Sequence, residues 1–405
     1  SRDQTRLRVL AGRYAESACS EPMAQRREKW RLHNRLAART FPFHIEDNGS
    51  YFQDLMPPLE CDDEAGRALE GRLLYALTAY EAIDDDSIIP DRFVVDWVTP
   101  LTGYCDDLEI TRADNGRGSR LGYKTNRPVA DINADMGKLR RRTIRLDRDA
   151  TQRHADVAAE AFAGLLPVEI GRAGTMYSDG ITNRAVHLMG MQELYLQMAL
   201  DPAAVHRLLS FLAEDSMALG QWEEEQGLLT LNHDGNQGYC TGSTLYSDET
   251  ACPAGDRVAS TDRYGYLESQ ESAGISAGMF DEFVMPHLSR AADKFKLLMF
   301  GCCEPVHDFM PVLRRLHGLR KVSVTPWCDL RKLVQTCPRD VIWCRKPVPL
   351  KLCGESFSLD GLRAHLVETL EVGRDHFIEF VFRDTNLLTG DMAGRVAQTC
   401  AMIRE

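Results

Sequence analysis

Residues 297–346 read LLMFGCCEPVHDFMPVLRRLHGLRKVSVTPWCDLRKLVQTCPRDVIWCRK. Three short strand-like runs stand in this stretch, at Leu297–Phe300, Lys321–Val324 and Val341–Cys344, and a segment long enough for a helix separates each run from the next. Such alternation is typical of strand–helix units whose strands form a parallel sheet buried on both faces. The stretch therefore predicts an α/β fold.

The same alternation continues on both sides of this stretch. No Gly-x-Gly-x-x-Gly turn follows any of the runs, so the pattern favours a closed (β/α)8 TIM barrel over an open dinucleotide-binding sheet. Helices with clear ends separate the runs: Asp201-Pro202 begins one helix, and a stripe of leucines ends at Gly373 in another. The further predicted strands are Phe93–Val98, Leu166–Ile170, Leu228–Leu231 and Phe377–Phe382, with an eighth near His187–Met189.

The first ninety residues have a different pattern. Ala24–Thr40 and Glu64–Ile83 predict helices, the pair Pro57-Pro58 interrupts the chain between them, and no strand pattern is visible before residue 90. We therefore expect a helical N-terminal extension at residues 1–90 and a (β/α)8 barrel domain at residues 91–405.

Composition limits the classes of function. The chain has 405 residues, 44% of them hydrophobic and 27% charged, which is typical of a globular protein. Its net charge of -12 opposes binding to nucleic acid or to an anionic membrane. No apolar stretch approaches the roughly 18 residues of a membrane span, and the polar start Ser1–Arg13 does not resemble a signal peptide. The twelve irregularly spaced cysteines indicate reduced thiols, so we expect a cytoplasmic protein.

Polar residues follow almost every predicted strand. In a parallel barrel the carboxyl ends of the strands form the catalytic rim, so these residues are expected to converge. They include thiols, a histidine, carboxylates and cations, a mixture that indicates a functional site. The candidates are His233 and Asp234; Cys302, Cys303 and Glu304; Trp327, Cys328 and Asp329; Arg345 and Lys346; and Arg383, Asp384, Thr385 and Asn386.

Two chemistries are compatible with this rim. Thiolate, imidazole and carboxylate groups can hold a zinc ion with one open position, for which Cys302, Cys303 and Cys328 are the predicted ligands. Alternatively, cations bind an acidic substrate while a carboxylate such as Asp96 or Asp234 moves a proton. Cys302 and Cys303 are equally compatible with a packed structural pair.

We assign three predicted roles to these residues. The catalytic candidates are His233, Asp234, Glu304 and Asp384; the substrate-binding candidates are Asp96, Trp327, Arg345, Lys346, Arg383 and Asn386; and the metal candidates are Cys302, Cys303 and Cys328.

The segment Ile275–Leu288, ISAGMFDEFVMPHL, followed by Leu297–Cys302, resembles the uroporphyrinogen decarboxylase superfamily. That superfamily also contains methyltransferases that move methyl groups between corrinoid proteins and thiols or folates. Phe280, Phe283 and His287 fall on one helical face, on which Pro286 is expected to produce a kink. The resemblance implies a (β/α)8 barrel, an N-terminal helical extension and a homodimer.

Departures from the superfamily narrow the expected chemistry. The decarboxylases carry an Arg-Gln-Ala-Gly-Arg segment that grips substrate carboxylates, and residues 1–100 contain no such string. The zinc-dependent methyltransferases use a His-x-Cys turn, where this chain has Phe300-Gly301-Cys302. The resemblance therefore implies Cys302 as a zinc ligand, with Cys303, Glu304, Cys328, His233 or His307 as its companions. No Asp-x-His-x-x-Gly corrinoid signature occurs, so a corrinoid would arrive on a separate protein.

These observations lead to one expected function and two alternatives. We expect a corrinoid-linked methyltransferase that acts on a small substrate, or on a thiol or folate acceptor. Its expected cofactors are zinc and a corrinoid carried by a partner protein. The first alternative is a decarboxylase or lyase that holds a carboxylated substrate with Arg345, Lys346 and Arg383. The second is a non-catalytic barrel that binds a tetrapyrrole or a partner protein.

Overall fold

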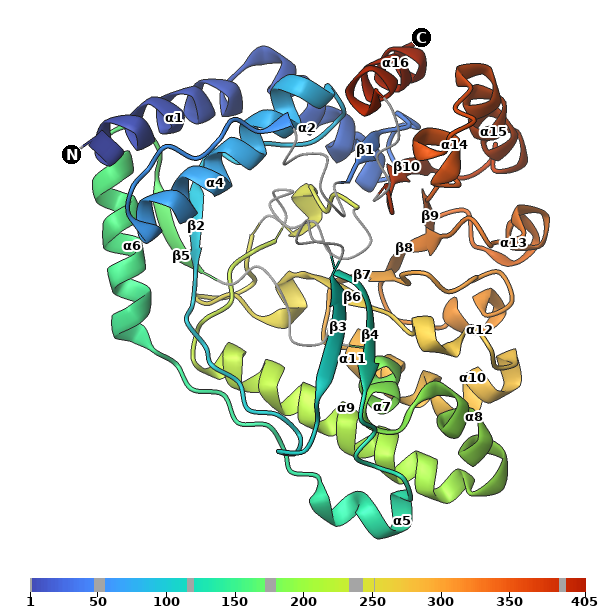
Figure 1. Ribbon diagram of the computed structural model, residues 1–405. Helices are drawn as coiled ribbons and strands as arrows, with labels where there is room; N and C mark the ends of the chain where they lie inside the picture. The colour runs from blue at the N-terminus through green and yellow to red at the C-terminus, as the bar shows by residue number, and fades with distance from the viewer. Residues whose placement is uncertain are drawn as a thin grey trace.

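Parallel strands surrounded by helices make up the chain, and the computed structural model describes residues 2–46, 55–114, 120–171, 180–232, 243–250, 252–385 and 391–405 (Figure 1). Six parallel strands form one sheet in the order β1, β10, β9, β8, β7, β6. Strands β2 and β5 form a second parallel sheet, and β3 and β4 pair as an antiparallel hairpin. The fold is therefore of the α/β class, and the ladders of the described residues do not join the two parallel sheets into a closed ring.

The strands are β1 (Phe43–Ile45), β2 (Phe93–Asp96), β3 (Ile110–Asp114), β4 (Arg120–Thr125), β5 (Val168–Gly171), β6 (Tyr264–Leu267), β7 (Leu297–Phe300), β8 (Leu319–Val324), β9 (Ile342–Arg345) and β10 (Ile378–Phe382). The helices of the N-terminal half are α1 (Arg2–Ala18), α2 (Glu21–Asn34), α4 (Glu64–Thr78), α5 (Ile132–Asp135), α6 (Arg148–Phe162), α7 (Ile181–Met189), α8 (Met191–Leu200) and α9 (Pro202–Glu225). Those of the C-terminal half are α10 (Ala277–Phe283), α11 (Met285–Ala292), α12 (Met310–Leu313), α13 (Leu330–Thr336), α14 (Leu350–Cys353), α15 (Leu359–Val372) and α16 (Met392–Arg404).

Most of the predicted strands are confirmed, with ends that differ by one or two residues. They correspond to β2, β5, β7, β8, β9 and β10. The predicted run Leu228–Leu231 carries only a single bridge residue, at Leu229. The strand predicted near His187–Met189 is wrong, because this segment lies in α7, where Ile181, Ala185 and Leu188 are buried at helical spacing.

Strands β1 and β6 were not predicted. Strand β1 has only three residues, and β6 has the sequence Tyr-Gly-Tyr-Leu, in which glycine weakens the strand signal. The expectation of no strand before residue 90 is therefore wrong, because Phe43–Ile45 pairs in parallel with β10. The division of the chain at residue 90 stays a prediction, and the N-terminal segment contributes one strand to the main sheet.

The helix ends follow the expected capping chemistry. The Asp201 side chain accepts a hydrogen bond from the Ala204 N–H at the start of α9, and α15 ends at Gly373. The segment Phe280–His287 forms two helices, α10 and α11, rather than one kinked helix. Pro286 occupies the first turn of α11, where its missing N–H costs no helical hydrogen bond.

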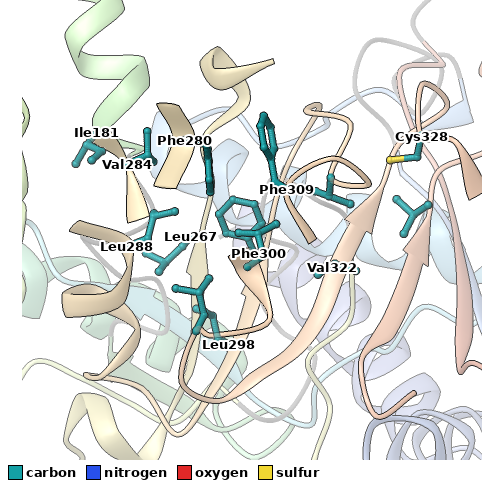
Figure 2. Close-up of a cluster of buried hydrophobic side chains, with 14 of the residues drawn as sticks. Ile181, Leu267, Phe280, Val284, Leu288, Leu298, Phe300, Phe309, Val322 and Cys328 are labelled. Atoms are coloured by element: carbon teal, nitrogen blue, oxygen red, sulfur yellow. The ribbon is translucent and has the colours of Figure 1, made fainter. Parts of the chain in front are cut away.

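Alternation along the strands separates two apolar regions. Leu298, Phe300 and Val322 point toward the helices, and Figure 2 shows them packed with Phe280 and Phe309. The alternate residues form a second cluster on the opposite face of the sheet, which we call the inner face: Tyr264, Tyr266, Leu297, Met299, Cys344 and Val381. Among the described residues, no helix is both long and apolar enough to cross a membrane.

Candidate functional site

Polar side chains continue the inner face at the carboxyl ends of four strands. The two-residue period of a strand puts Glu268 in line with Tyr264 and Tyr266, and Lys346 in line with Cys344. The same period places Arg383 after β10 and Glu46 after β1 on this face. These groups interact electrostatically, since the positive charge of Lys346 acts to lower the pKa values of both Glu268 and Glu46. We call Glu46, Glu268, Lys346 and Arg383 the strand-end cluster.

Glu268 is the most perturbed acid of this cluster. Glu268 is 8% exposed, and its Oε2 atom has no hydrogen-bond partner among the described residues. A Cβ atom on Gly180 would lie 2.8 Å from Glu268 Oε1, so a glycine at the start of α7 gives this carboxyl group room. Burial, together with repulsion from the neighbouring ionisable groups Glu304 and Cys302, raises the pKa of Glu268 to about 9, although Lys346 opposes the shift. Glu268 is therefore a protonated acid at neutral pH.

Glu304 has a different role in the geometry. It is fully buried, and its carboxylate accepts hydrogen bonds from the Ser269 N–H at 2.9 Å and from the Cys302 N–H at 2.8 Å. Burial raises the pKa of Glu304, while these backbone donors oppose that shift. The side chain ties the segment after β6 to the segment after β7, and so fixes Glu268 relative to Cys302.

The two adjacent thiols lie at the same strand end. Cys302 Sγ and Cys303 Sγ are 3.7 Å apart, and Cys303 is exposed whereas Cys302 is buried. The contact with Cys302, followed by burial, raises the pKa of Cys303 well above its usual range. Cys303 is therefore a protonated thiol unless a ligand or a cation stabilises its thiolate.

Two cations complete the cluster. Lys346 Nζ donates to the Cys302 carbonyl oxygen, which also accepts from Ser323 Oγ at 2.8 Å. Arg383 Nε lies 3.2 Å from Glu46 Oε2 as an ion pair. Burial raises the pKa of Glu46, and Arg383 opposes that shift. Asp384, the next residue, has a positive φ of 59°. Its carboxyl group acts to raise the pKa values of Glu46 and Cys303.

The structure brings together about half of the residues predicted from sequence. Cys302, Cys303, Glu304, Lys346, Arg383 and Asp384 lie at neighbouring strand ends. His233, Asp234 and Asn386 lie outside the described residues.

The remaining predicted residues lie elsewhere. Arg345 points away from Lys346 and donates to the carbonyl oxygens of Val324 and Thr325. Cys328 is buried near the apolar cluster of Figure 2, and burial raises its pKa. Trp327 is 71% exposed and lines a groove of about 490 Å³ together with Tyr123, Met191 and Cys303. Asp96 is exposed at the end of β2, in the other parallel sheet.

The described residues do not fit a three-ligand zinc site. No group of three His, Cys, Asp or Glu side chains among them converges as metal ligands. Both carboxylate oxygens of Glu304 face backbone N–H groups, and Cys328 contacts Thr325 rather than the thiol pair. A zinc ion held by Cys302 and Cys303 would need a further ligand from outside the described residues, for which His233 is the sequence candidate.

Sequence reasoning missed Glu268 and Glu46. Both were overlooked because the strands before them, β6 and β1, were not predicted. The available signal was a carboxylate directly after a short aromatic run, as in Tyr264–Leu267 followed by Glu268.

Comparisons with known proteins support the fold. No protein-family model matches the chain, and no curated protein sequence matches it. Among solved structures it is similar to a methyltransferase from Methanosarcina mazei, with a TM-score of 0.52 and 12% sequence identity. The similarity covers 93% of this chain and 97% of that chain. At this identity the likeness concerns the overall fold alone.

Proposed function

We propose that the protein is a methyltransferase of the corrinoid-linked type. It would move a methyl group between a small substrate, or a thiol or folate acceptor, and a corrinoid carried by a separate protein. The observation that carries the proposal is Glu268, a buried acid whose Oε2 atom has no hydrogen-bond partner among the described residues and which lies beside Lys346 and the thiol pair. The fold that the chain shares with a methyltransferase over nearly its whole length supports the same class.

The residues of the cluster suit the breaking of a methyl–heteroatom bond. When that bond breaks, its electron pair remains on the donor heteroatom, which becomes a better leaving group once it is protonated. Glu268 holds a proton at neutral pH because its pKa is raised to about 9. The Lys346 ammonium group stabilises the Glu268 carboxylate that remains after the proton has moved. The exposed groove beside Cys303, with Trp327 and Met191 in its wall, is the surface on which we place the corrinoid protein.

Zinc remains a proposed cofactor that requires a ligand such as His233. If it binds, it supplies thiol activation, and no step above depends on it. The test is the metal content of protein purified without chelators, in wild type, Cys302→Ala and the matched control Cys328→Ala. We expect about one zinc per chain, lost in Cys302→Ala and kept in Cys328→Ala, because Cys328 packs against the helix layer. Absence of zinc from the wild type would remove the metal from the proposal.

Closure of the strands into a (β/α)8 barrel belongs to the same proposal. The segment before residue 233 is the candidate for a further barrel strand between β5 and β6. Asn232 exchanges side-chain hydrogen bonds with the backbone of Tyr264 at 2.8 and 3.0 Å, and Thr230 lies directly against Gly171. A homodimer and a cytoplasmic location complete the proposal; the second is favoured by the thiol state of the described cysteines, which form no disulfide bonds.

A decarboxylase or lyase acting on a carboxylated substrate is the second candidate. It is favoured by the two cations, Lys346 and Arg383, on the same face as the acid Glu268. An acid of raised pKa would then protonate the carbon from which carbon dioxide departs. A barrel that binds a tetrapyrrole or a partner without catalysis is the third.

One set of assays separates the three candidates. The purified protein is incubated with cob(I)alamin and a methyl donor, either 2-(methylthio)ethanol or 5-methyltetrahydrofolate, which is the direction in which Glu268 protonates the departing heteroatom, and separately with a porphyrinogen. Methyl transfer that falls in Glu268→Gln supports the proposal. Release of carbon dioxide from the porphyrinogen would replace it by the decarboxylase, and tight tetrapyrrole binding without turnover would replace it by the non-catalytic protein.

A further inference from the structure

A large cavity lies between α4 and strand β1, away from the groove at Trp327. Its volume is about 700 Å³, within the range of roughly 300 to 1,000 Å³ that small-molecule sites occupy. Its described lining comes from α1, β1, α4, residues 87–94 and the pair Ser243 and Thr244.

The cavity occupies the gap between the two parallel sheets. Strand β1 is the last strand of the six-stranded sheet and β2 is the first of the other, and no described ladder joins them. His44 of β1 and Glu46, which follows β1, line the cavity on one side, and Phe93 of β2 lines it on the other. Glu46 also belongs to the strand-end cluster through its ion pair with Arg383, so the cavity adjoins that cluster.

Basic side chains dominate the polar part of the described lining. They are His44, Arg67, Arg72 and Arg92, whereas the lone carboxyl group of that lining is Glu46. Arg92 is paired with Glu169 at 2.9 Å, so Arg67, Arg72 and His44 are the groups that give the cavity its basic character. Burial raises the pKa of Glu46, which weakens its negative charge, and Arg383 lies 3.2 Å from it. A basic cavity is unexpected in a chain with a net charge of -12, and it favours an anionic ligand.

His44 is held in a fixed orientation at the inner end of the cavity. Its Nδ1 atom lies 2.9 Å from Asp85 Oδ2 and 2.7 Å from Ser87 Oγ. Asp85 is itself fixed, because it accepts hydrogen bonds from the backbone N–H groups of Ile45 and Ser87. With Nδ1 occupied, Nε2 is the ring nitrogen left for a ligand. Burial opposes the charged form, but the carboxylate of Asp85 outweighs it and raises the pKa of His44.

Arg72 is positioned by its own contacts. One nitrogen, Nη2, donates to the Val94 carbonyl oxygen at 2.8 Å, and the guanidinium carbon lies 4.0 Å from the centre of the Phe93 ring. A guanidinium group has five N–H donors, so this anchoring leaves donors for an anion. Aromatic rings of Tyr14, Tyr75, Tyr80 and Phe93 form much of the remaining wall.

We propose that this cavity binds a small aromatic carboxylate. The cationic groups of α4 and β1, with Arg72 and His44 foremost, hold the carboxylate, and the tyrosines and Phe93 pack against the ring. This binding site adjoins the strand-end cluster at Glu46, but carboxylate binding there does not depend on methyl transfer.

The test measures binding alone, with 2-naphthoate as the probe and its neutral analogue 2-naphthamide as the control ligand. Isothermal titration calorimetry on the full chain is expected to give at least about tenfold tighter binding of the acid, which corresponds to about 1.4 kcal/mol. Equal affinity for the acid and the amide, or no binding of either, would overturn the proposal. Displacement of 2-naphthoate by inorganic phosphate at lower concentration would show a phosphate site in its place.

Substitutions locate the site. Arg72→Gln and His44→Gln are each expected to weaken 2-naphthoate binding at least about fivefold, whereas Arg153→Gln on α6 removes the same charge outside the cavity and should leave it unchanged. Arg72→Lys and Arg67→Gln are included in case Arg72→Gln does not fold, which circular dichroism would reveal. Unchanged affinity in His44→Gln and in the folded arginine variants would place the ligand elsewhere.

Discussion

Two pairs of glutamate and lysine lie on the inner face of the same sheet: Lys321 with Glu379, which we call the lower pair, and Lys346 with Glu268, which we call the upper pair. The two pairs differ in how many of their polar atoms have hydrogen-bond partners. In the lower pair, Lys321 Nζ donates to Glu379 Oε2 at 2.7 Å, to Ser243 Oγ at 2.9 Å and to the Thr244 carbonyl oxygen at 3.0 Å. Both side chains are 0% exposed. In the upper pair, Lys346 donates to a backbone carbonyl, and Glu268 has an oxygen without a described partner.

The pKa values of the two glutamates move in opposite directions. Burial acts against the charge on Glu379, but Lys321 and His33 outweigh it, so the pKa of Glu379 falls to about 2. Burial acts in the same sense on Glu268 without such compensation, and its pKa rises to about 9. Because acid and base roles are assigned by environments that push pKa values apart, we assign the Lys321–Glu379 pair to the stability of the fold and Glu268 to the proton transfer of the proposed function.

The largest expected loss of stability comes from breaking the lower pair. Lys321→Met leaves the Glu379 carboxylate buried without its main partner, and we expect a loss of about 3–5 kcal/mol in the free energy of unfolding. Denaturant unfolding at pH 7 measures this loss. The double variant Lys321→Met/Glu379→Leu removes both charges and should recover at least half of it. A single variant as stable as the wild type would contradict the structural role of the pair.

Substitution of Glu268 in the upper pair should affect the rate of methyl transfer. Glu268→Gln keeps the shape of the side chain and removes the transferable proton, so methyl transfer should fall by about 100-fold at pH 7. In the wild type the rate should decline as the pH rises through about 9, where Glu268 loses its proton, and this limb should be missing in the variant. Glu355→Gln, an exposed residue outside the cluster, is the control and should retain the wild-type profile.

The same substitution should stabilise the protein at alkaline pH. A carboxyl group whose pKa is raised from 4.5 in the unfolded chain to about 9 in the fold contributes its full stability below pH 4.5 and loses it progressively as the pH rises to about 9. Glutamine has no such loss, so Glu268→Gln should gain about 4–5 kcal/mol over the wild type at pH 8 and close to nothing at pH 4.5. Thermal unfolding at both pH values measures the difference, and a constant offset would show that ionisation is not its cause.

The comparison also explains what the sequence can and cannot predict. Strands β7 to β10 are visible because their residues are buried on both faces and read as apolar runs. The lower pair could not be predicted from the sequence. Lys321 and Glu379 belong to predicted strands, where a charged residue only weakens the apolar pattern, and their pairing depends on the spatial order of the strands. Glu268 was lost with its unpredicted strand.

The direction in which a side chain points after the end of a strand was the second feature that the sequence could not predict. Cys328 follows β8 and was expected at the rim, but the turn after Val324 carries its side chain back against the helix layer. Such a reversal depends on turn geometry that residue types alone do not specify. Cys302, Cys303 and Lys346 are neighbours in the structure, as expected from their positions after strands of the central sheet, and their roles stay predictions.

The smallest expected effect distinguishes two neighbours at the carboxyl end of β9. Arg345 and Lys346 are adjacent in sequence and were both predicted to bind substrate, yet they point to opposite faces. Lys346 opposes the rise in the pKa of Glu268, whereas the charged neighbours of Arg345 are Cys328 and Glu368. Lys346→Met should therefore raise the pKa of Glu268 further and move the alkaline limb of activity upward by up to about one pH unit, and Arg345→Met should leave the limb in place. Rate measurements between pH 7 and about 10.5 would resolve this shift, since one unit corresponds to about 1.4 kcal/mol. An equal shift in both variants would mean that the limb reports net charge rather than the acid at the strand ends.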